Sequence, residues 1–264
     1  MVSTLLKERD DGAGATPHLS FSRVNRYLTC PEQYRFYYVE KLRPKVPSAN
    51  LVFGNVVHQV LAGFFLRGED PVKCFGEMWL LIKQVPLAYG ERDSWERLSS
   101  TGEAILRKFL GDEVPKLGPI RAVEKPFTFS VSGIELPMVG IIDLVAELSG
   151  RLTIIDFKTA AASYGADDAA LSDQLTVYSL AEPTVEDLAL CVLVKTKEPK
   201  IQWQFTQRDG ERLAAYLAKA RLVVDDITAG RFYTRSGFWC AWCDYRAICV
   251  GNRTKAAETL VRIE

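Results

Sequence analysis

Apolar positions recur at helical spacing through the first 111 residues of the chain. The pattern predicts four helical segments, over residues 21–42, 53–68, 71–85 and 94–111. Ser20 is placed to cap the first of these, and Pro31 marks a break or a new first turn inside it. In the second segment Val57, Leu61 and Phe65 fall on one face. The N-terminal part therefore reads as a layer of helices.

After residue 120 the pattern changes to that of β-strands. The predicted strands cover residues 121–131, 134–148, 151–159, 188–196 and 201–206. The turn pairs Ser132-Gly133 and Ser149-Gly150 make the first three strands consecutive hairpins. Helices predicted over 170–181 and 208–229 flank the last two strands. This order predicts an α/β fold with a central sheet and an N-terminal helical layer.

Two of the predicted strands carry charges where apolar residues dominate. Asp156 and Lys158 are two positions apart, so they point to the same face of their strand, and Asp143 interrupts the apolar run of the strand before it. If the two strands pair, both carboxylates converge, at a cost of several kcal/mol per ion. A divalent cation removes that cost, since Mg²⁺ binds one or two carboxylates together with waters and phosphate oxygens. A solvated Asp–Lys bridge at the end of a sheet is the alternative.

Composition and charge restrict the classes of function. The 264 residues, 48% hydrophobic and 25% charged, suit one large domain or a core domain with an appendage. Lys plus Arg and Asp plus Glu both number 33, so binding to a polyanion must come from local patches. We find no GxxxxGK[ST] phosphate loop, and no apolar run that approaches the roughly 20 residues of a membrane span. Residues 1–18 lack the apolar core of a signal peptide, so we expect a disordered N-terminus and a cytoplasmic protein.

Four of the six cysteines have the spacing of metal ligands. Cys240, Cys243 and Cys249 form a CxxCx5C pattern, and Cys30 lies some two hundred residues earlier. In the cytoplasm such cysteines are more often reduced thiols or metal ligands than disulfides. Three closely spaced cysteines do not complete a four-thiolate site, so the fourth ligand must come from elsewhere. Zinc suits four thiolates as well as an iron–sulfur cluster does.

The acidic strands resemble a known nuclease signature. Asp143, twelve intervening residues and then Asp156-Phe157-Lys158 are similar to the PD-(D/E)XK motif, although Ile142 stands where the motif's name has proline. The surrounding hairpin looks like the RecB-like branch of that superfamily. The resemblance implies a restriction-endonuclease-like mixed central sheet flanked by helices, in a single nuclease domain over 19–250 followed by a C-terminal tail over 251–264.

The resemblance also implies an active site. It assigns catalytic roles to Asp143, Asp156, Lys158, Gln174 and Tyr178, and metal binding to His58, Asp143, Asp156 and the Phe157 carbonyl, with Glu124 as a possible further acid. The implied metal is Mg²⁺ or Mn²⁺, because an imidazole among oxygens also suits Mn²⁺. From the residues alone, a histidine on an apolar helical face is usually a core residue. The four-residue spacing of glutamine and tyrosine alone is typical of any amphipathic helix.

The split cysteines add a second implied cofactor. One cysteine before the nuclease motifs and CxxCx5C after them look like the iron–sulfur staple of AddB-type nucleases and CRISPR-associated RecB-like exonucleases. The resemblance implies a [4Fe–4S] cluster held by Cys30, Cys240, Cys243 and Cys249, which would join residues 19–45 to 237–250. Zn²⁺ is the alternative occupant.

DNA is the implied substrate, and two basic patches are candidates to contact it. The first comprises Arg35, Lys41, Arg43 and Lys45, beside the aromatic residues of 34–38, and the second comprises Lys195, Lys197 and Lys200. A solvated charged face explains either patch equally simply. We expect an exonuclease that acts on DNA ends or single strands, with a helicase or integrase as a possible partner. The alternatives are a structure-specific endonuclease and a catalytically silent DNA-binding or scaffold subunit of a repair or recombination complex.

Overall fold

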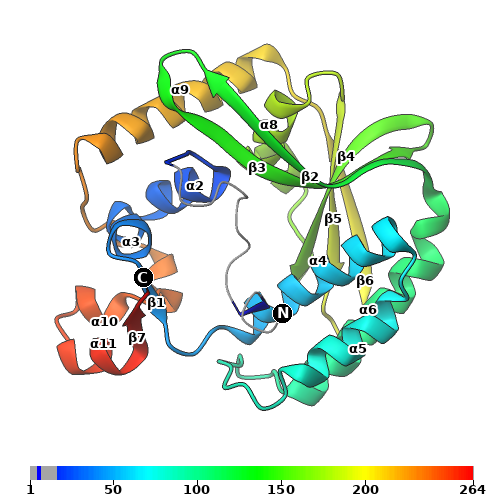
Figure 1. Ribbon diagram of the computed structural model, residues 1–264, viewed down its shortest axis with the longest axis horizontal. Helices are drawn as coiled ribbons and strands as arrows, with labels where there is room; N and C mark the ends of the chain where they lie inside the picture. Colours follow the sequence, from blue (N-terminus) through cyan, green and yellow to red (C-terminus); the bar gives the residue numbers. More distant parts are fainter. Residues whose placement is uncertain (1–4, 7–16, 264) are drawn as a thin grey trace.

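A five-stranded mixed sheet is the centre of the computed structural model, which describes residues 5–6 and 17–263 (Figure 1). The strands lie in the order β2 (Leu117–Val131), β3 (Ile134–Leu148), β4 (Arg151–Ala160), β5 (Asp187–Val194) and β6 (Lys200–Thr206). The β4–β5 pair is parallel and the other three neighbouring pairs are antiparallel. Helices flank the sheet on both sides, so the predicted α/β class with a mixed central sheet is confirmed.

The β3–β4 hairpin fixes the register on which the candidate site depends. Ser149 and Gly150 connect the strands with φ values of 54° and 78°, the left-handed backbone of a tight two-residue hairpin turn. The ladder runs from Leu148–Arg151 to Leu144–Ile155. It ends one residue before Asp143 and Asp156, so the two acids lie where the strands separate.

One face of the sheet is covered by three long helices, each with a polar N-cap. These are α4 (Ala49–Arg67), α5 (Pro71–Leu81) and α6 (Trp95–Asp112), and a short 3₁₀ turn (Val114–Lys116) leads from them into β2. Ser48, Asp70 and Ser94 accept hydrogen bonds from first-turn backbone N–H groups. Because Ser48 is the cap, α4 begins four residues before the predicted start. The interface buries aromatic side chains, including Phe53, Phe75, Trp79, Phe109 and Phe157.

The opposite face packs against α7 (Asp168–Leu171) and α8 (Asp173–Ala181), and α9 (Gly210–Thr228) crosses outside them. The single helix predicted over 170–181 is wrong in one respect, because the chain is extended at Ser172, with φ −69° and ψ 108°. The Ser172 hydroxyl instead accepts from the Leu175 N–H and caps α8. A serine that competes for backbone hydrogen bonds therefore divides the predicted segment.

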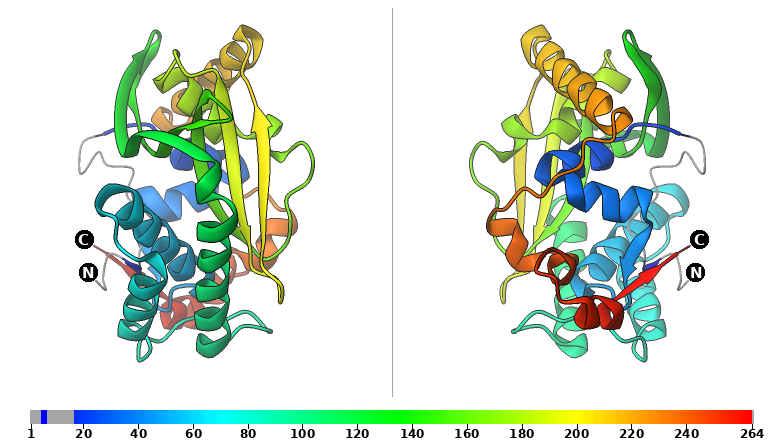
Figure 2. Two further views of the ribbon diagram at one scale, coloured as in Figure 1. Left: turned by 90° about the vertical axis from the view of Figure 1, so that its right-hand side faces the viewer. Right: turned by 90° about the vertical axis from the view of Figure 1, so that its left-hand side faces the viewer.

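Residues 31–44 and 238–262, which are far apart in the sequence, lie together around α3, away from the sheet (Figures 1 and 2). The N-terminal elements are α2 (Phe21–Thr29), α3 (Pro31–Tyr34), a π-helical turn (Arg35–Val39) and β1 (Leu42–Pro44). The C-terminal elements are a 3₁₀ turn (Phe238–Trp242), α10 (Arg246–Cys249), α11 (Arg253–Thr259) and β7 (Leu260–Arg262). β7 pairs antiparallel with β1, so most of the predicted tail is a helix and a strand that returns to the N-terminal part. Pro31 opens α3 at its first turn, as predicted.

Helix α4 and the N-terminal residues bear on two predictions made from the sequence. The expectation that no segment has the length and composition of a membrane span is wrong for α4, which has 19 residues and a mean hydropathy of 1.4. Eight residues of this helix are buried in the core against α5, α6 and the sheet, an environment that accounts for its apolar sequence. The predicted disorder over 1–18 falls mainly on residues 1–4 and 7–16, which lie outside the described residues.

Candidate active site

Asp143 and Asp156 lie at the point where β3 and β4 separate, and both are almost fully buried, with 4% and 1% of their surfaces exposed. The Phe157 backbone N–H donates to Asp143 Oδ2 over 2.9 Å. A carboxylate thus accepts a main-chain hydrogen bond at the end of the ladder. The predicted convergence of the two strands on one acidic point is present in the structure.

A chain of side-chain hydrogen bonds links these strands to α8. Lys158 Nζ lies 2.7 Å from Asp156 Oδ2 and donates to Gln174 Oε1 over 2.7 Å. Gln174 Nε2 donates to the Tyr178 hydroxyl (2.7 Å), which donates to the Ile141 carbonyl (2.9 Å) and lies 3.3 Å from Asp156 Oδ1. Gln174 and Tyr178 are one helical turn apart, so α8 presents both to the same place. The structure therefore brings these predicted residues together around the Asp–Lys pair.

The burial of this pair shifts both ionisation equilibria. Burial raises the pKa of Asp156, and the nearby Asp143 charge adds to this, so that together they outweigh the opposite effect of Lys158. Burial by itself lowers the pKa of Lys158, but the carboxylates of Asp156 and Asp143 outweigh it and the net pKa is raised. Lys158 is therefore a cation at neutral pH. A single ammonium does not offset the electrostatic cost of the two acids.

Two further residues, His58 and Glu124, lie beside Asp143 in the acidic centre. His58 from α4, Glu124 from β2 and Asp143 from β3 place one ligand atom each within 4.8 Å of one another. His58 Nδ1 is 3.4 Å from Asp143 Oδ2. Glu124 has a φ of 46°, a left-handed conformation that costs an ordinary residue of order 1 kcal/mol and that clusters at functional sites. Sequence reasoning held Glu124 as a possible member, and the geometry puts it beside His58 and Asp143.

These residues fit a divalent cation. Among the described residues, Asp156 Oδ2 is a buried oxygen with no well-aligned hydrogen-bond partner, despite its ion pair with Lys158. Glu124 and Asp143 lie with His58 in one group of ligand atoms, and the charge of Asp143 also acts on Asp156. Carboxylate oxygens with one imidazole form a donor set suited to Mg²⁺ or Mn²⁺. The role of the Phe157 carbonyl as a ligand stays a prediction.

Two glutamines of β6 hold the loop after β4, and sequence reasoning missed them. Gln202 accepts from the Tyr164 N–H (2.8 Å) and donates to the Tyr164 carbonyl (3.0 Å). Gln204 accepts from the Ala169 N–H (3.0 Å) and donates to the Gly165 carbonyl (2.5 Å). This double clamp fixes the segment that follows Lys158. The signal in the sequence is the alternation "IQWQF", which puts both amides on one face of a strand.

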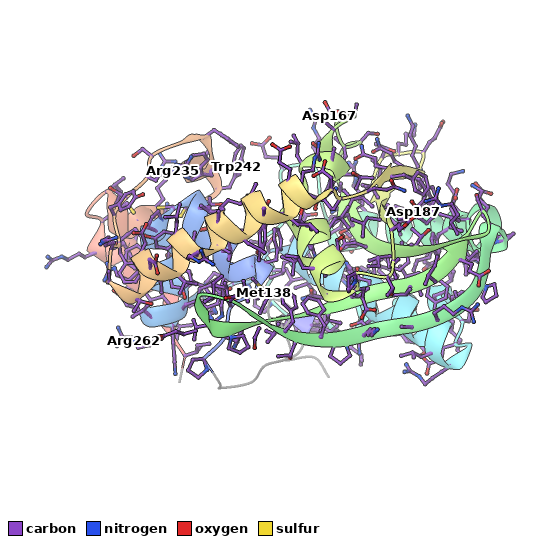
Figure 3. The ribbon with its side chains drawn as sticks, turned by 90° about the horizontal axis from the view of Figure 1, so that it is seen from above. Met138, Asp167, Asp187, Arg235, Trp242 and Arg262 are labelled. Atoms are coloured by element: carbon purple, nitrogen blue, oxygen red, sulfur yellow. The ribbon has the colours of Figure 1, made fainter. Side chains whose placement is uncertain are left out.

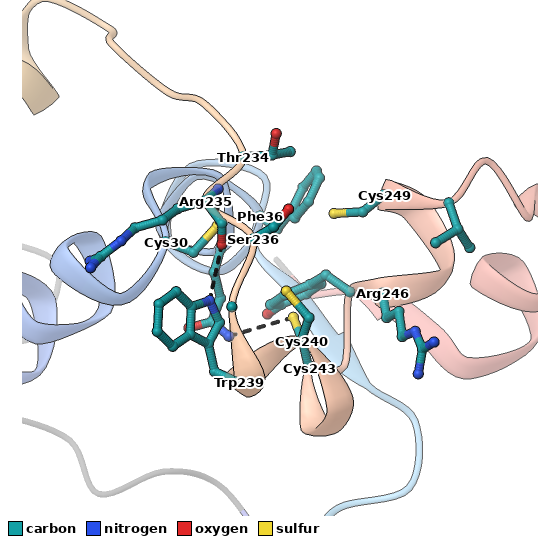
Figure 4. A pocket seen from close by; sticks show the side chains of 14 residues that line it. Cys30, Phe36, Thr234, Arg235, Ser236, Trp239, Cys240, Cys243, Arg246 and Cys249 are labelled. Carbon is teal, nitrogen blue, oxygen red and sulfur yellow. Dashed lines mark hydrogen bonds between the residues drawn. The ribbon is translucent and has the colours of Figure 1, made fainter.

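The four predicted cluster cysteines line one cavity of about 290 Å³ between the chain ends (Figure 4). Two N–H groups contact their sulfurs: Gln33 Nε2 donates to Cys243 Sγ (3.6 Å), and the Arg235 backbone N–H donates to Cys30 Sγ (3.4 Å). Burial, followed by the charges of the neighbouring cysteines, raises the pKa of the Cys249 thiol. Four thiolates in this cavity therefore require a positively charged partner.

The predicted DNA-contacting residues are largely engaged within the protein. Arg35 forms ion pairs with Glu32 and Glu40. Arg43 donates to the Tyr37 carbonyl (2.6 Å) and stacks 3.3 Å from the centre of its ring. Among the lysines, Lys45 donates to the Ala257 carbonyl and Lys195 to the Asn50 side chain. Within the described part of the chain, the side chains of Lys41, Lys197 and Lys200 make no comparable contact. Their contact with DNA stays a prediction.

Comparison with known proteins agrees with this geometry. The chain belongs to the PD-(D/E)XK nuclease superfamily, whose family model matches residues 18–250. A crystal structure of a candidate exonuclease from Eubacterium rectale is similar, with a TM-score of 0.54 and 12% identity over 87% of this chain and 88% of that one. The crystal structure of SSO0001 has a TM-score of 0.47 and 14% identity over 94% and 93%, a similarity too low to support an inference. No curated protein sequence matches. At these identities the structural likeness defines the fold alone.

Proposed function

We propose that this member of a nuclease superfamily is a deoxyribonuclease that depends on Mg²⁺ or Mn²⁺ and hydrolyses phosphodiester bonds from DNA ends or in single strands. The observation that carries the proposal is that His58, Glu124 and Asp143 place ligand atoms within 4.8 Å of one another, next to the buried Asp156–Lys158 ion pair. The one ammonium of Lys158 balances a single carboxylate, so the remaining acidic charge favours a bound cation.

Each side chain of the acidic centre has a distinct proposed role. His58, Glu124 and Asp143, whose ligand atoms lie within 4.8 Å of one another, would hold the cation, and the buried Asp156 beside them would join them. A bound divalent ion lowers the pKa of a water molecule and stabilises charge on the phosphate oxygens. Lys158, held toward the acids by Gln174, orients the attacking water by hydrogen bonding and offsets negative charge that develops on phosphorus. Tyr178 keeps Gln174 and the β3 backbone in place.

Exonuclease action and the remaining cofactor rest on resemblance and on the geometry of the chain ends. A [4Fe–4S] cluster on Cys30, Cys240, Cys243 and Cys249 is supported by the resemblance and by the fact that all four cysteines line one cavity, with Zn²⁺ as the alternative occupant. Cytoplasmic location and a helicase or integrase partner remain part of the proposal. A silent DNA-binding subunit is disfavoured because the acids, the lysine and the supporting residues are all present and bonded.

The test is digestion of single-stranded DNA labelled at the 5′ or 3′ end, with free or blocked ends, by anaerobically purified protein with Mg²⁺ or Mn²⁺. We expect metal-dependent cleavage that end-blocking suppresses and that Asp156→Asn abolishes. Glu186→Gln, which changes a side chain with 80% of its surface exposed, is the matched control and keeps full activity. Undiminished cleavage by Asp156→Asn would refute the assigned role, and cleavage of blocked DNA would favour the endonuclease.

A further inference from the structure

Two large aromatic rings next to the cysteine cavity are left in solvent. Phe238 and Trp242 have 77% and 76% of their surfaces exposed, and Trp242 lies near Arg235 in Figure 3. Burial of large aromatic side chains is normally favourable, so the exposure of both rings needs an explanation. The same segment buries Tyr245 against Phe36, with ring centroids 5.2 Å apart. The fold can therefore cover an aromatic ring here, but these two remain outside.

The two exposed rings are held by an ordered scaffold. Phe238 and Trp242 are the first and last residues of a 3₁₀ turn, and their ring centroids are 6.2 Å apart at an interplanar angle of 76°. Trp239, between them, donates its indole N–H to the Arg235 carbonyl (3.0 Å), and the Arg235 guanidinium lies 5.0 Å from its ring centre. The hydrogen bond of Trp239 holds the turn that carries both exposed rings. Little backbone ordering is therefore required when a ligand covers them.

The segment that carries these rings is strongly basic, although the chain as a whole has no net charge. Residues 231–255 contain five basic residues, Arg231, Arg235, Arg246, Arg253 and Lys255, against a single acid, Asp244. All five basic residues are exposed. Six of these 25 residues are aromatic: Phe232, Tyr233, Phe238, Trp239, Trp242 and Tyr245. Aromatic rings among arginines and lysines are the composition of surfaces that bind single-stranded nucleic acid.

We propose that Phe238 and Trp242 form a base-stacking platform for single-stranded DNA, with Arg246, Arg253 and Lys255 on its phosphates. Arg231 pairs with Asp226 and Arg235 donates to the Leu28 carbonyl, so these two arginines are engaged within the protein. The proposal rests on the proposed function, since it supplies the substrate of that nuclease with a binding site outside the acidic centre. Unpaired bases offer the flat faces that exposed rings stack on, whereas a duplex hides them. The local excess of positive charge favours a polyanion over an uncharged protein surface as the occupant.

The test measures the affinity of the full chain for a fluorescein-labelled oligo-dT, without added divalent ion so that the DNA stays intact. Phe238→Ala/Trp242→Ala weakens binding by about tenfold or more, because each stacked base contributes that order of affinity. Trp242→Leu keeps apolar bulk without an aromatic face and also weakens binding, whereas Trp242→Phe retains most of it. Phe205→Ala is the matched control, since Phe205 is an aromatic residue of β6 with 60% of its surface exposed.

Two further readouts separate stacking from charge. The double alanine variant leaves the slope of log affinity against log salt concentration unchanged, while Arg253→Gln/Lys255→Gln lowers that slope. Affinity for a blunt duplex is unaltered by either aromatic replacement. Wild-type affinity for oligo-dT in both the double alanine variant and Trp242→Leu overturns the platform, including the case in which these rings contact a partner protein instead. A protein that binds oligo-dT through these rings but cleaves no DNA would refute the proposed function and leave the platform standing.

Discussion

The acidic centre and the closure of the chain ends are built on different principles. At the acidic centre, side chains from α4, β2, β3, β4 and α8 are held by sheet register and by a continuous series of hydrogen bonds. At the chain ends, four cysteines surround a cavity, and the apolar cluster beside them has only three buried members, Phe36, Tyr245 and Leu260. The first region is organised by the polypeptide itself, whereas the proposed function makes the order of the second depend on a metal or cluster bound by its four cysteines.

We therefore expect substitutions in the acidic centre to affect mainly activity, and substitutions at the chain ends to affect mainly stability. The acidic centre stores electrostatic cost in a fold that the large core already supports, so replacing its residues removes activity and leaves the structure in place. The chain ends contribute little apolar burial of their own, so replacing a cysteine loosens the structure first.

The largest expected effect is the loss of cleavage in Asp156→Asn or Lys158→Ala, by at least about 10³-fold. The melting temperature of metal-free Asp156→Asn falls by less than that of a cysteine variant. Burial raises the pKa of Asp156, so a neutral amide removes a penalty on its charged form above the unfolded pKa, and this offsets part of the loss of the ion pair with Lys158. Single-turnover digestion and thermal unfolding at pH 7.5 measure both. A melting temperature that drops as far as that of a cysteine variant would contradict the contrast.

The second effect, in Cys243→Ala, is the opposite one: a loss of stability. We expect loss of bound iron or zinc and a fall in melting temperature of more than about 5 °C, because metal binding at the chain ends is coupled to folding. Metal analysis, the absorbance spectrum and thermal unfolding measure it, and Cys74→Ala is the control because Cys74 lies on α5, outside the cavity. An unchanged metal content and an unchanged melting temperature in Cys243→Ala would contradict the role of Cys243 as a metal ligand.

An intermediate effect is expected in Glu124→Gln. The amide keeps the size of the side chain but removes one negative ligand, so the Mg²⁺ concentration for half-maximal cleavage rises by about 10- to 100-fold. The rate at saturating metal recovers most of its wild-type value. Glu135→Gln, which alters an exposed acid at the start of β3, is the control. An unchanged metal requirement would exclude Glu124 from the centre.

A smaller effect is expected in Tyr178→Phe. The variant loses the hydrogen bond to the Ile141 carbonyl and the partner of Gln174, at a cost of about 1 kcal/mol in the free energy of unfolding. Cleavage slows by about tenfold because Gln174 holds Lys158 less firmly. Denaturant unfolding and a KM-against-kcat comparison separate the two, since a purely structural role would leave kcat unchanged.

The smallest effect concerns Tyr27, which ties α2 to the chain after α9 by donating to the Arg231 carbonyl over 2.6 Å. Burial raises its pKa from 10.0 to about 12. Because the folded pKa is the higher one, the stability this group contributes is complete below pH 10 and is lost as the pH rises to 12. The stability gap between wild type and Tyr27→Phe therefore shrinks over that range in urea titrations. A gap that stays constant would mean that the hydroxyl titrates normally.

The order of helices and strands and the strand register were readable from the sequence because short-range signals determine them. The hairpin turn at Ser149-Gly150 and the alternation in β3 and β4 gave the strand bounds within a few residues and put Asp156 and Lys158 on one face. The break at Ser172 was missed because its cause is one hydroxyl that bonds locally. The extent of α4 was underestimated because its first turn depends on the Ser48 cap.

The membership of the candidate site was less accessible to sequence reasoning. His58, Gln174 and Tyr178 have ordinary interpretations as core or amphipathic residues, and the resemblance to a family singled them out. Glu124 joins the centre through the β2–β3 register and a left-handed backbone, neither of which a local pattern encodes. The clamps made by Gln202 and Gln204 depend on β6 lying beside the loop after β4, which is a tertiary fact.

The most direct test of the account is a crystal structure of the protein soaked in Mn²⁺, with anomalous scattering used to locate the ion. We predict an anomalous peak within about 2.5 Å of oxygens of both Asp143 and Asp156, with His58 or Glu124 on its other side, that disappears in Asp143→Asn. A clear map with no manganese there, and with Asp156 still bonded to Lys158 alone, would contradict it.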